Sequence, residues 1–600
     1  MAVTVLPTDP TAALPIPERE VDNSSKKRAA VKLLDRLDAL EDEGKAGRSK
    51  YRSAKESQQS VDLYRGEQGP ASGAEPHFKA NFIEAFIDRQ VALLTDNRPI
   101  IMVEPRKVGL AGLARVLDAC ADTVWTESAM QRQAWKLGLL AAIEGSAGLY
   151  TGYDAEADET YIEVVSRDQC WMDPAIREAA LIGTHAEYFG IERIQTTAEI
   201  MARYLISVDA DVSVLEDEED KRAKTLLGPI ETVIRRLGGR RDQTPTESMA
   251  MPRARTKEIF VKDRTRDPSG LRLFPTYRRI LRTADAILWD GPLPMWDGVI
   301  PVDWYDWAVD PKHPWGMDEP QGLKHMQGAY NELLDGCVEN HVLTSFIQFV
   351  ADFDAVDEKT WQLFNKIKRS IVIRKKNRNA TTAVIPPIPF GADTISLARF
   401  IFTAMQLKTG VTDVTLGEHP GSLQSGAAIA GLVEGASLMS RSRQSRLEDL
   451  YTRVGQKLIA RVLQHFTGDR ILGLLGPTPD AVDAVLKRSE FFVKEDGTRT
   501  TDAERREAFR YLRFGVVPGS SQAGARTARA KMMIELNKGR SAARIDVLRA
   551  AGIPDPEEML KRADEEFAKM HPSPPPAQVP PGTPEKHSIS WESAAPAPRP

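Results

Sequence analysis

The fold is decided by residues 399–466, which read RFIFTAMQLKTGVTDVTLGEHPGSLQSGAAIAGLVEGASLMSRSRQSRLEDLYTRVGQKLIARVLQHF. They contain the end of one helix, a glycine-rich loop and a segment from Ser422 to Phe466 without proline. A helix of that length would span about 68 Å at 1.5 Å per residue. Its second half carries an apolar stripe at helical spacing, formed by Leu447, Leu450, Val454, Leu458 and Val462. This half is predicted to pack against a core, whereas the small residues of the first half favour a kink.

The loop at 410–426 is rich in glycine and predicted to be exposed. Its polar residues are Thr412, Asp413, Thr415, Glu418, His419, Ser422 and Gln424. No Lys or Arg occurs from Val411 to Ser440, and the basic residues Arg441, Arg443 and Arg446 follow without an acid between them. Because phosphate binding depends on cations, the loop is predicted to be a poor phosphate clamp.

This arrangement resembles the signature of tailed-bacteriophage portal proteins, in which a stem helix leads into a tunnel loop and then a long kinked helix. The order and spacing of several elements carry the resemblance: Thr409-Gly410-Val411, Gly417, the Ser425-Gly426 pair and the Arg-rich helix after them. Further matches are Tyr64-x-Gly66-x-Gln68, an Asp-Pro-x-x-Arg turn at Asp173, Pro174 and Arg177, and the pair Gln327 and Asn331. The resemblance covers roughly residues 62–567.

Composition excludes several classes of protein. The 600 residues carry a net charge of only −5 and are 42% hydrophobic, which argues against a broad nucleic-acid-gripping surface and for a sizeable core. Cys120, Cys170 and Cys337 are scattered, which is typical of a reduced, intracellular setting. No signal peptide is expected at the N-terminus, and no apolar run reaches the length of a membrane-spanning helix.

The first half of the chain alternates helical and strand patterns. A helix is expected from Ser24 or Ser25, a polar loop at Asp62–Pro70, and a helix capped by Asn81 and stopped by Pro99 before a short strand at Ile100–Val103. One amphipathic helix is predicted over Leu110–Gly138, and strands over Leu149–Val165. The charged stretch 209–255 is interpreted as a solvated insertion, with a binding patch as the alternative.

From Lys257 to Trp307 the pattern is that of strands, with Pro301 restricting its strand to an edge or an end. Four tryptophans lie here, at 289, 296, 304 and 307. A stacking platform for nucleic acid is one interpretation, but packing in a core or a subunit interface is favoured.

A helix is predicted from about Glu319 to Val350, and a second one over Asp393–Lys408; in portal proteins these would be the two stem helices. Between them lies the clip, with a dense basic cluster: Lys366, Lys368, Arg369, Arg374, Lys375, Lys376 and Arg378. Two explanations stay open for this cluster. The charges protect an exposed strand edge, or they form a docking surface for an acidic partner or for DNA.

The portal resemblance implies an α+β, mainly helical fold with wing, stem, clip and crown regions. The expected regions are an N-terminal arm and helix (1–60), a wing (61–310), stem helices (311–350 and 392–409), a clip (351–391), a tunnel loop (410–426), a long kinked helix (427–466), a C-terminal helical wing or crown region (467–570) and a disordered Pro-rich tail (571–600).

No enzyme signature was found. GxxxxGK[ST], HExxH, GxSxG and CxxC are all missing from the sequence, and we expect neither a cofactor nor a metal. The weak pair Asp209 and Asp211 leaves open a metal-dependent nucleic-acid-processing enzyme. A structural head-to-tail adaptor without a DNA channel is a third hypothesis.

The resemblance implies a homo-oligomeric ring, typically of twelve subunits, at one capsid vertex of the virion, assembled in the host cytoplasm. Double-stranded DNA would pass through its channel during packaging and ejection, with the loop residues facing the DNA. The implied partners are the terminase large subunit, head-completion or tail adaptor proteins, scaffold and major capsid protein, with no membrane. Because the loop lacks Lys and Arg, the expected mechanism is passive guidance of sliding DNA.

Overall fold

A computed structural model describes residues 23–67, 79–96, 98–107, 109–155, 157, 159–210, 252–284, 286–345, 347–352, 359, 362, 370–375, 383–385, 392–411, 438–466, 501–516, 560 and 563. The chain divides into two compact units, Met1–Ala523 and Gly524–Pro600. All the helices and strands below belong to the first unit, which combines helices and sheets as expected.

A layer of helices forms the largest core: α3 (Phe82–Thr95), α4 (Ala111–Glu127), α5 (Met130–Glu144) and α13 (Leu438–His465). The apolar stripe predicted for α13 is fully buried in it, as Leu450 and Val454 show. Asn81 caps α3 as predicted, its side chain accepting from the backbone N–H of Glu84. The single helix predicted over Leu110–Gly138 is wrong. The chain breaks at Ser128 and Ala129, and Ala129 adopts a left-handed φ of 48° that ends α4 before α5 begins.

Two antiparallel sheets lie beside these helices. One has the strand order β3-β2-β9, from β3 (Glu159–Ser166), β2 (Ser146–Asp154) and β9 (Val302–Asp306). The other has the order β4-β5-β6-β7-β8, from β4 (Cys170–Met172), β5 (Tyr188–Thr196), β6 (Arg253–Val261), β7 (Arg278–Arg282) and β8 (Ile287–Pro292). As predicted, Pro301 precedes an edge strand, β9. Short helical segments η1 (Arg167–Gln169), η2 (Ala179–Leu181), α6 (Ile182–His185) and α7 (Thr197–Tyr204) join the strands.

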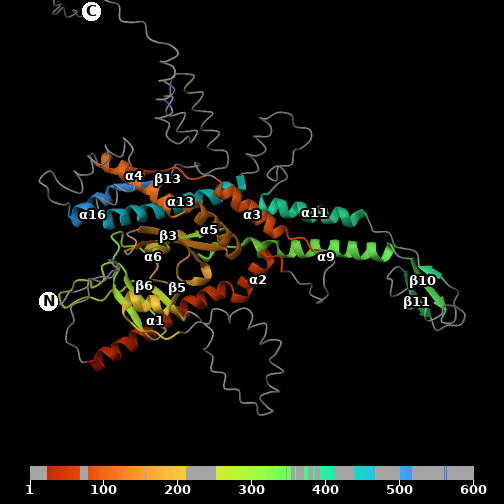
Figure 1. The fold of residues 1–600 in the computed structure, drawn as a ribbon, viewed down its shortest axis with the longest axis horizontal. Coiled ribbons are helices and arrows are strands. Elements are labelled where there is room, and N and C mark those ends of the chain that lie inside the picture. The colour runs from red at the N-terminus through yellow and green to blue at the C-terminus, as the bar shows by residue number, and fades with distance from the viewer. Residues whose placement is uncertain are drawn as a thin grey trace, which may run out of the picture. The chain divides into compact units, whose positions relative to one another are not determined.

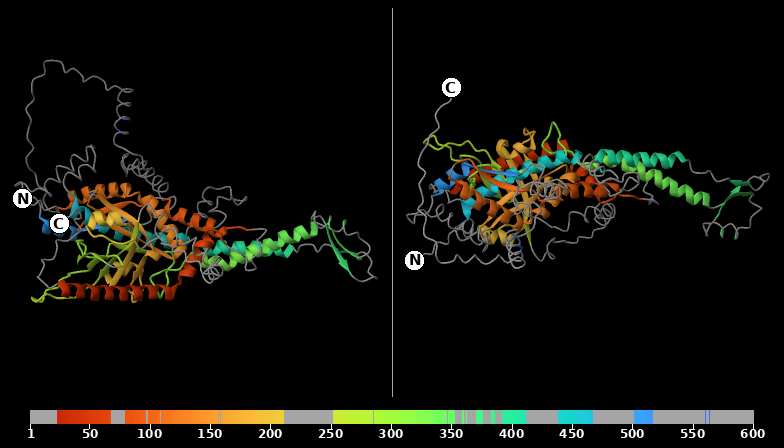
Figure 2. Two further views of the ribbon diagram at one scale, coloured as in Figure 1. Left: turned by 60° about the horizontal axis from the view of Figure 1, so that its bottom comes forward. Right: turned by 90° about the horizontal axis from the view of Figure 1, so that it is seen from above.

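The N-terminal helix α1 (Asn23–Tyr51) runs along the five-stranded sheet (Figure 2). Leu37 is buried against Trp171 and Ile259, and Glu41 accepts from Lys257 and Arg282 on the sheet. The sequence did not predict the next helix, α2 (Ala54–Tyr64), whose last residues fall in the expected polar loop. Ser53 and Glu56 form a capping box that starts it, because each satisfies a backbone N–H of the other.

Two long helices, α9 (Glu319–Ser345) and α11 (Ala392–Thr409), run side by side away from the sheets (Figure 1). The helix predicted to reach Val350 ends five residues earlier. Two residues later β10 (Ile347–Asp352) begins, because the run Ile-Gln-Phe-Val favours a strand. β10 pairs in parallel with β11 (Ser370–Lys375) and antiparallel with β12 (Ala383–Ile385).

Segments far apart in the sequence form a two-stranded sheet. β1 (Ile101–Pro105) pairs antiparallel with β13 (Leu512–Val516), so that Val103 lies opposite Phe514. β13 follows α16 (Asp502–Arg510) directly, and both pack on α13. The two-stranded sheet therefore joins residues about four hundred positions apart to one core.

The two most deeply buried tryptophans confirm the prediction that these residues pack in a core and do not form a stacking platform for nucleic acid. Trp304 and Trp307 are 1% and 0% exposed, so neither offers a ring to nucleic acid. Cys120, Cys170 and Cys337 are free thiols, and the first two are buried. The Pro-rich tail, the crown helices and most of the charged insertion lie outside the described residues.

Candidate functional site

The root of the predicted tunnel loop is formed where α11 ends, beside α3 and the start of α13. Gly410 has a left-handed φ of 72° and its N–H donates to the Gln406 carbonyl at 2.9 Å, which closes α11. Gln90 on α3, only 6% exposed, donates from Nε2 to the Thr409 carbonyl at 2.6 Å. Val411, the last described residue at the start of the loop, is also buried. The loop therefore leaves the body from a fixed point.

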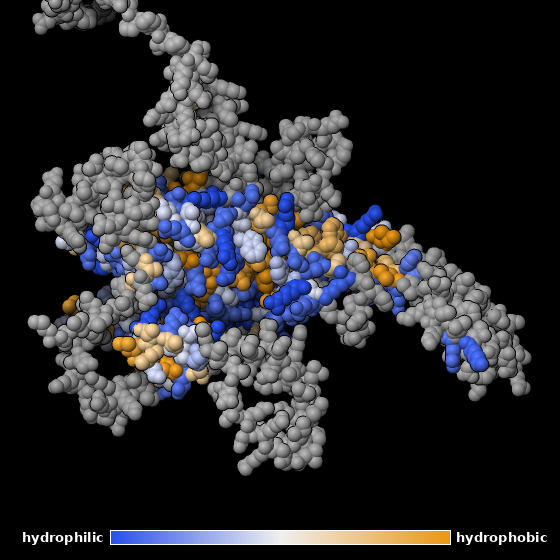
Figure 3. All heavy atoms as spheres, viewed as in Figure 1, coloured by the Kyte–Doolittle hydropathy of each residue, from blue (hydrophilic) through white to orange (hydrophobic). Residues whose placement is uncertain are grey.

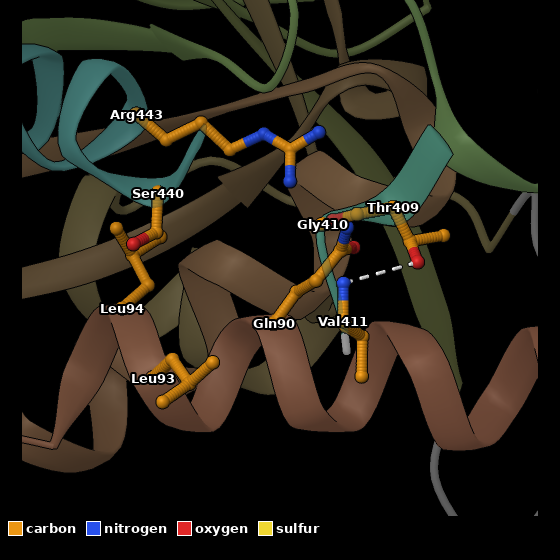
Figure 4. Close-up of a pocket in the computed structure, with 8 residues that line it drawn as sticks. All are labelled: Gln90, Leu93, Leu94, Thr409, Gly410, Val411, Ser440 and Arg443. Carbon is orange, nitrogen blue, oxygen red and sulfur yellow. Dashed lines mark hydrogen bonds between the residues drawn. The ribbon is translucent and has the colours of Figure 1, made fainter. Parts of the chain in front are cut away.

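A small cavity of about 20 Å³ lies at this root (Figure 4). Leu93 and Leu94 of α3 line one side, and Ser440 and Arg443 of α13 line another. A cavity of this size holds about one water molecule, so it is not a substrate site. Its place shows instead that the chain on both sides of the loop, at Val411 and at Ser440, converges on α3.

The first basic residues of α13 are used inside the subunit. The Arg443 guanidinium lies 4.2 Å from the centre of the Trp307 ring, and its Nη2 is 3.0 Å from the Glu319 carboxylate. The Trp307 indole N–H donates to the same carboxylate at 2.9 Å, and Arg446 donates to the Trp307 carbonyl. Arg441 is half-buried and also engaged in an interaction. Arg443 and Arg446 therefore join α13 to Trp307, directly after β9, and Arg443 also joins it to the start of α9.

The rest of α13 repeats this pattern along β9. Lys457 is buried, lies 2.8 Å from the Asp303 carboxylate and donates to the Ile300 and Val302 carbonyls. Burial lowers the pKa of Lys457, and the charge of Asp303 opposes that shift. Arg461, fully buried, is 3.2 Å from Asp297. The cations on this face of α13 thus hold the helix against β9 and its flanking residues. Arg443, Arg446, Lys457 and Arg461 all have partners within the subunit, so these four charges are not available to bind a ligand.

Two of the motifs that resemble portal proteins have a structural role at the base of α9. Gln327 is fully buried; it accepts from the Phe82 N–H at 3.1 Å and donates to the Ala80 carbonyl at 2.8 Å. Asn331 accepts from the Ala80 N–H at 3.2 Å. The two side chains therefore hold the start of α3 against α9.

The Tyr-x-Gly-x-Gln element acts at the other end of the same junction. The Tyr64 carbonyl accepts from the Asn81 side chain at 2.7 Å, and the Tyr64 hydroxyl donates to Asp88 at 2.8 Å. Gly66 has a φ of 70° and packs on Asn81, where a side chain would meet it. Tyr64 and Gly66 therefore join the end of α2 to the start of α3, whereas Gln68 lies outside the described residues.

A buried carboxyl that the sequence did not single out lies where α5 ends. Glu144 accepts from the Ser166 hydroxyl at 2.7 Å and from the Arg167 N–H at 2.9 Å. Burial raises its pKa to about 7, and the charge of Asp168 adds to the rise. Its only sequence signal is a lone charge before Gly145 in an apolar run. It serves as a junction between α5 and η1, because its carboxylate accepts from the Ser166 hydroxyl and the Arg167 N–H.

The predicted loop and clip residues mostly lie outside the described part of the chain. Thr412, Asp413, Thr415, Glu418, His419, Ser422 and Gln424 all do, as do Lys366, Lys368, Arg369, Lys376 and Arg378. Arg374 and Lys375 are placed on β11 by their backbone, opposite Ala351 and Asp352 of β10. Two residues of the clip cluster thus lie on β11, and the neighbouring strand β10 places Asp352 opposite Lys375.

Residues that hold the root, Gln90 and Glu319, were missed as functional residues. A polar residue within the apolar stripe of α3 was the signal for Gln90; nothing in the sequence paired Glu319 with Arg443. Among the described residues no group of three or more His, Cys, Asp or Glu could hold a metal ion. Asp209 is exposed, and its partner Asp211 lies outside the described part. No described helix is long and apolar enough to cross a membrane.

Comparison with known proteins agrees with this architecture. No curated protein matches the chain. The family model of the phage P22-like portal protein matches residues 50–596, which is nearly the whole chain and includes α9, α11, the loop root and α13. Portal proteins of bacteriophages are structural head-to-tail connectors at the capsid vertex that take part in DNA packaging. The chain therefore belongs to the P22-like phage portal protein family.

Proposed function

We propose that this protein forms a ring, typically of twelve copies, whose channel carries double-stranded DNA into and out of the capsid. Family membership over residues 50–596 supports the proposal. In this ring α9 and α11 are the stem, the sheet of β10, β11 and β12 is the clip, and the α3, α4, α5 and α13 layer belongs to the wing. The protein acts without catalysis, by position and shape.

The observation that carries the channel function is the fixed root of the loop. Gln90 and the Gly410 turn anchor α11 at one side, and the Arg443 to Glu319 contact anchors α13 at the other. A loop held at both ends can project toward the channel axis while staying in register with the stem. Because residues 411–440 contain no Lys or Arg, the loop contacts DNA without strong phosphate binding, and the duplex slides.

The clip is proposed as the docking surface for the terminase large subunit during packaging and for head-completion or tail adaptor proteins afterwards. Its basic cluster, including Arg374 and Lys375, suits acidic partner surfaces. Scaffold and major capsid protein are the proposed partners during assembly in the host cytoplasm. In the virion the ring stays at the portal vertex.

Negative-stain imaging with mass determination of the purified full chain tests the ring directly. Rings with a central channel wide enough for a duplex are expected. A well-folded monomer that persists at high concentration with scaffold present would contradict the proposal.

The guidance mechanism is tested by placing cations on the loop. Replacing Glu418 and Gln424 with Lys is expected to leave ring assembly intact and to shorten the packaged DNA, because each cation adds a salt-sensitive phosphate contact. Glu178→Lys is the matched control, since that side chain is exposed on the wing. Packaged DNA of unchanged length in the loop variant would contradict passive guidance.

A further inference from the structure

The outer face of α11 carries an apolar stripe that the other described residues leave exposed. Leu397, Phe400 and Leu407 are 47%, 70% and 67% exposed, and Ala404 lies between them at the same three- and four-residue spacing. The opposite face of α11 is already satisfied, because Ala398 and Met405 are buried in the core. Figure 3 shows apolar side chains at the surface over this part of the molecule.

The outer face of α9 has the complementary shape. Gly328 and Gly336 are exposed, and a Cβ added at either would meet nothing within 4 Å. Glycine weakens a helix, so two glycines without an intramolecular reason are unexpected in α9. Gly455 in α13 shows the opposite case, because a neighbouring side chain packs directly on it. A Cβ added at Gly455 would overlap the Phe514 ring. The α9 glycines therefore leave room for a group outside the subunit.

The two faces point away from each other across the helix pair. Tyr330 and Phe402 meet between α9 and α11, with ring centres 6.5 Å apart. Gly328 lies two residues before Tyr330, and Phe400 two residues before Phe402. Two residues rotate an α-helix by roughly 200°. Gly328 therefore faces outward on the α9 side and Phe400 outward on the α11 side. Because the helices are antiparallel, the two residues lie within roughly 6 Å of each other along the helix axes.

Charges flank the two faces at matching heights. Arg399 is exposed beside the α11 stripe, and Glu332 and Glu339 are exposed on α9. The hydrogen bond from the Lys408 ammonium to the Gly322 carbonyl fixes the antiparallel register of the pair. That register puts Arg399 close to the level of Glu332. The apolar stripe of α11 is thus flanked by the cation Arg399, and the glycine face of α9 by the anions Glu332 and Glu339.

We propose that the α11 stripe of one copy docks on the α9 glycine face of the next copy, with Phe400 seated over Gly328 and Ala329 and Arg399 beside Glu332. This inference rests on the proposed ring and names the surfaces that close its stem. The occupant is a second copy because both complementary faces belong to one helix pair. Contact between two different faces is head-to-tail, and head-to-tail contacts form a ring where the rotation between copies closes, as the proposed ring requires.

Charge reversal in mixed chains tests the contact. The full-length variants Arg399→Glu and Glu332→Arg each place like charges across every interface, so each alone is expected to need at least about tenfold more protein than wild type for half-maximal ring formation. Mixed in equal amounts they can alternate around a ring, where each interface is again either wild type or fully reversed. The mixture is expected to assemble near the wild-type concentration, measured by native mass spectrometry.

A size change tests the seat of Phe400 separately. Gly328→Leu fills the seat and is expected to impair assembly, whereas Gly328→Ala is the milder control; melting of both unassembled chains should stay at or above that of wild type. Wild-type rings together with unimpaired Arg399→Glu and Gly328→Leu rings would overturn this contact but keep the proposed ring. A wild-type chain that forms no ring would instead overturn the proposed function. Impaired single variants without rescue in the mixture would also overturn the Arg399 to Glu332 pairing.

Discussion

The contact between α13 and β9 and the outer faces of α9 and α11 use their side chains in opposite ways. Along α13, charged groups point inward: Lys457 and Arg461 are buried and each lies against an aspartate. Along α11, apolar groups point outward, and Phe400 is 70% exposed. Buried charge needs a partner within reach, whereas exposed apolar area gains by being covered. The charged groups of the first region therefore have their partners within one subunit, whereas the second region has exposed apolar area that a partner can cover.

The largest effect on stability is expected from a substitution at Asp303, in the contact between α13 and β9. Asp303→Ala leaves Lys457 buried without its carboxylate, which should lower the free energy of unfolding by about 3–5 kcal/mol. Urea unfolding of the unassembled chain measures it. Asp449→Ala is the matched control, because that carboxylate is 63% exposed beside Arg453 and should cost less than about 1 kcal/mol. Equal losses in the two variants would contradict the contrast between the regions.

A pH series extends the contrast to a buried charge outside the α13–β9 contact, at the junction of α5 and η1. The pKa of Glu144 is raised from 4.5 to about 7, so the folded state holds its proton more tightly than the unfolded chain. The stabilising effect of that proton is complete below pH 4.5 and is lost as pH rises through 7, a change of about 3 kcal/mol. Glu144→Gln has no proton to lose at this position. The free energy of unfolding of the variant should therefore rise relative to that of wild type between pH 5 and 8.

Urea unfolding of both proteins at pH 5, 6, 7 and 8 measures this difference. Glu178→Gln, at an exposed site, serves as the control and should follow wild type at every pH. Parallel curves for Glu144→Gln and wild type would contradict a buried carboxyl with a raised pKa.

The smallest effects come from two glycines in the middle of helices, one in each region. Gly455→Ala would press on the Phe514 ring and is expected to lower stability by about 1–2 kcal/mol, since overpacking outweighs helix propensity. Gly328→Ala meets no atom and should raise stability by up to about 1 kcal/mol. Thermal melting of the unassembled chains compares them. The same sign for both substitutions would refute the distinction between a packed and an open helix face.

Sequence reasoning predicted the elements whose periodicity was strong. The α13 stripe, the Asn81 cap, the strands β2 and β3 and the paired helices α9 and α11 are confirmed. It failed where local geometry overrode the pattern. The left-handed turn at Ala129 splits one apparent helix into α4 and α5, and α2 was hidden in a polar stretch with a weak apolar face.

The candidate site was less predictable than the fold. The basic residues after the loop were visible in the sequence, but their partners were not, because Arg443 meets Glu319 across more than one hundred residues. Periodicity reports which face of a helix is buried and not what lies against it. The roles proposed for Glu418, Gln424 and the clip cluster remain predictions, since those residues lie outside the described part, apart from the backbone of Arg374 and Lys375.

The pairing of β1 with β13 has a consequence for synthesis. β1 leaves the ribosome early, but its partner is about four hundred residues behind it. Until translation reaches Val516, the backbone groups of Ile101–Pro105 on that side have no strand to bind, and unpaired edges invite association between chains. The helices packed on β1 can form first, but this sheet closes only after Val516 has been synthesised. Nascent chains crowded on one message are therefore most exposed to misassembly during that interval, and a chaperone that shields the edge would raise the yield of native subunits.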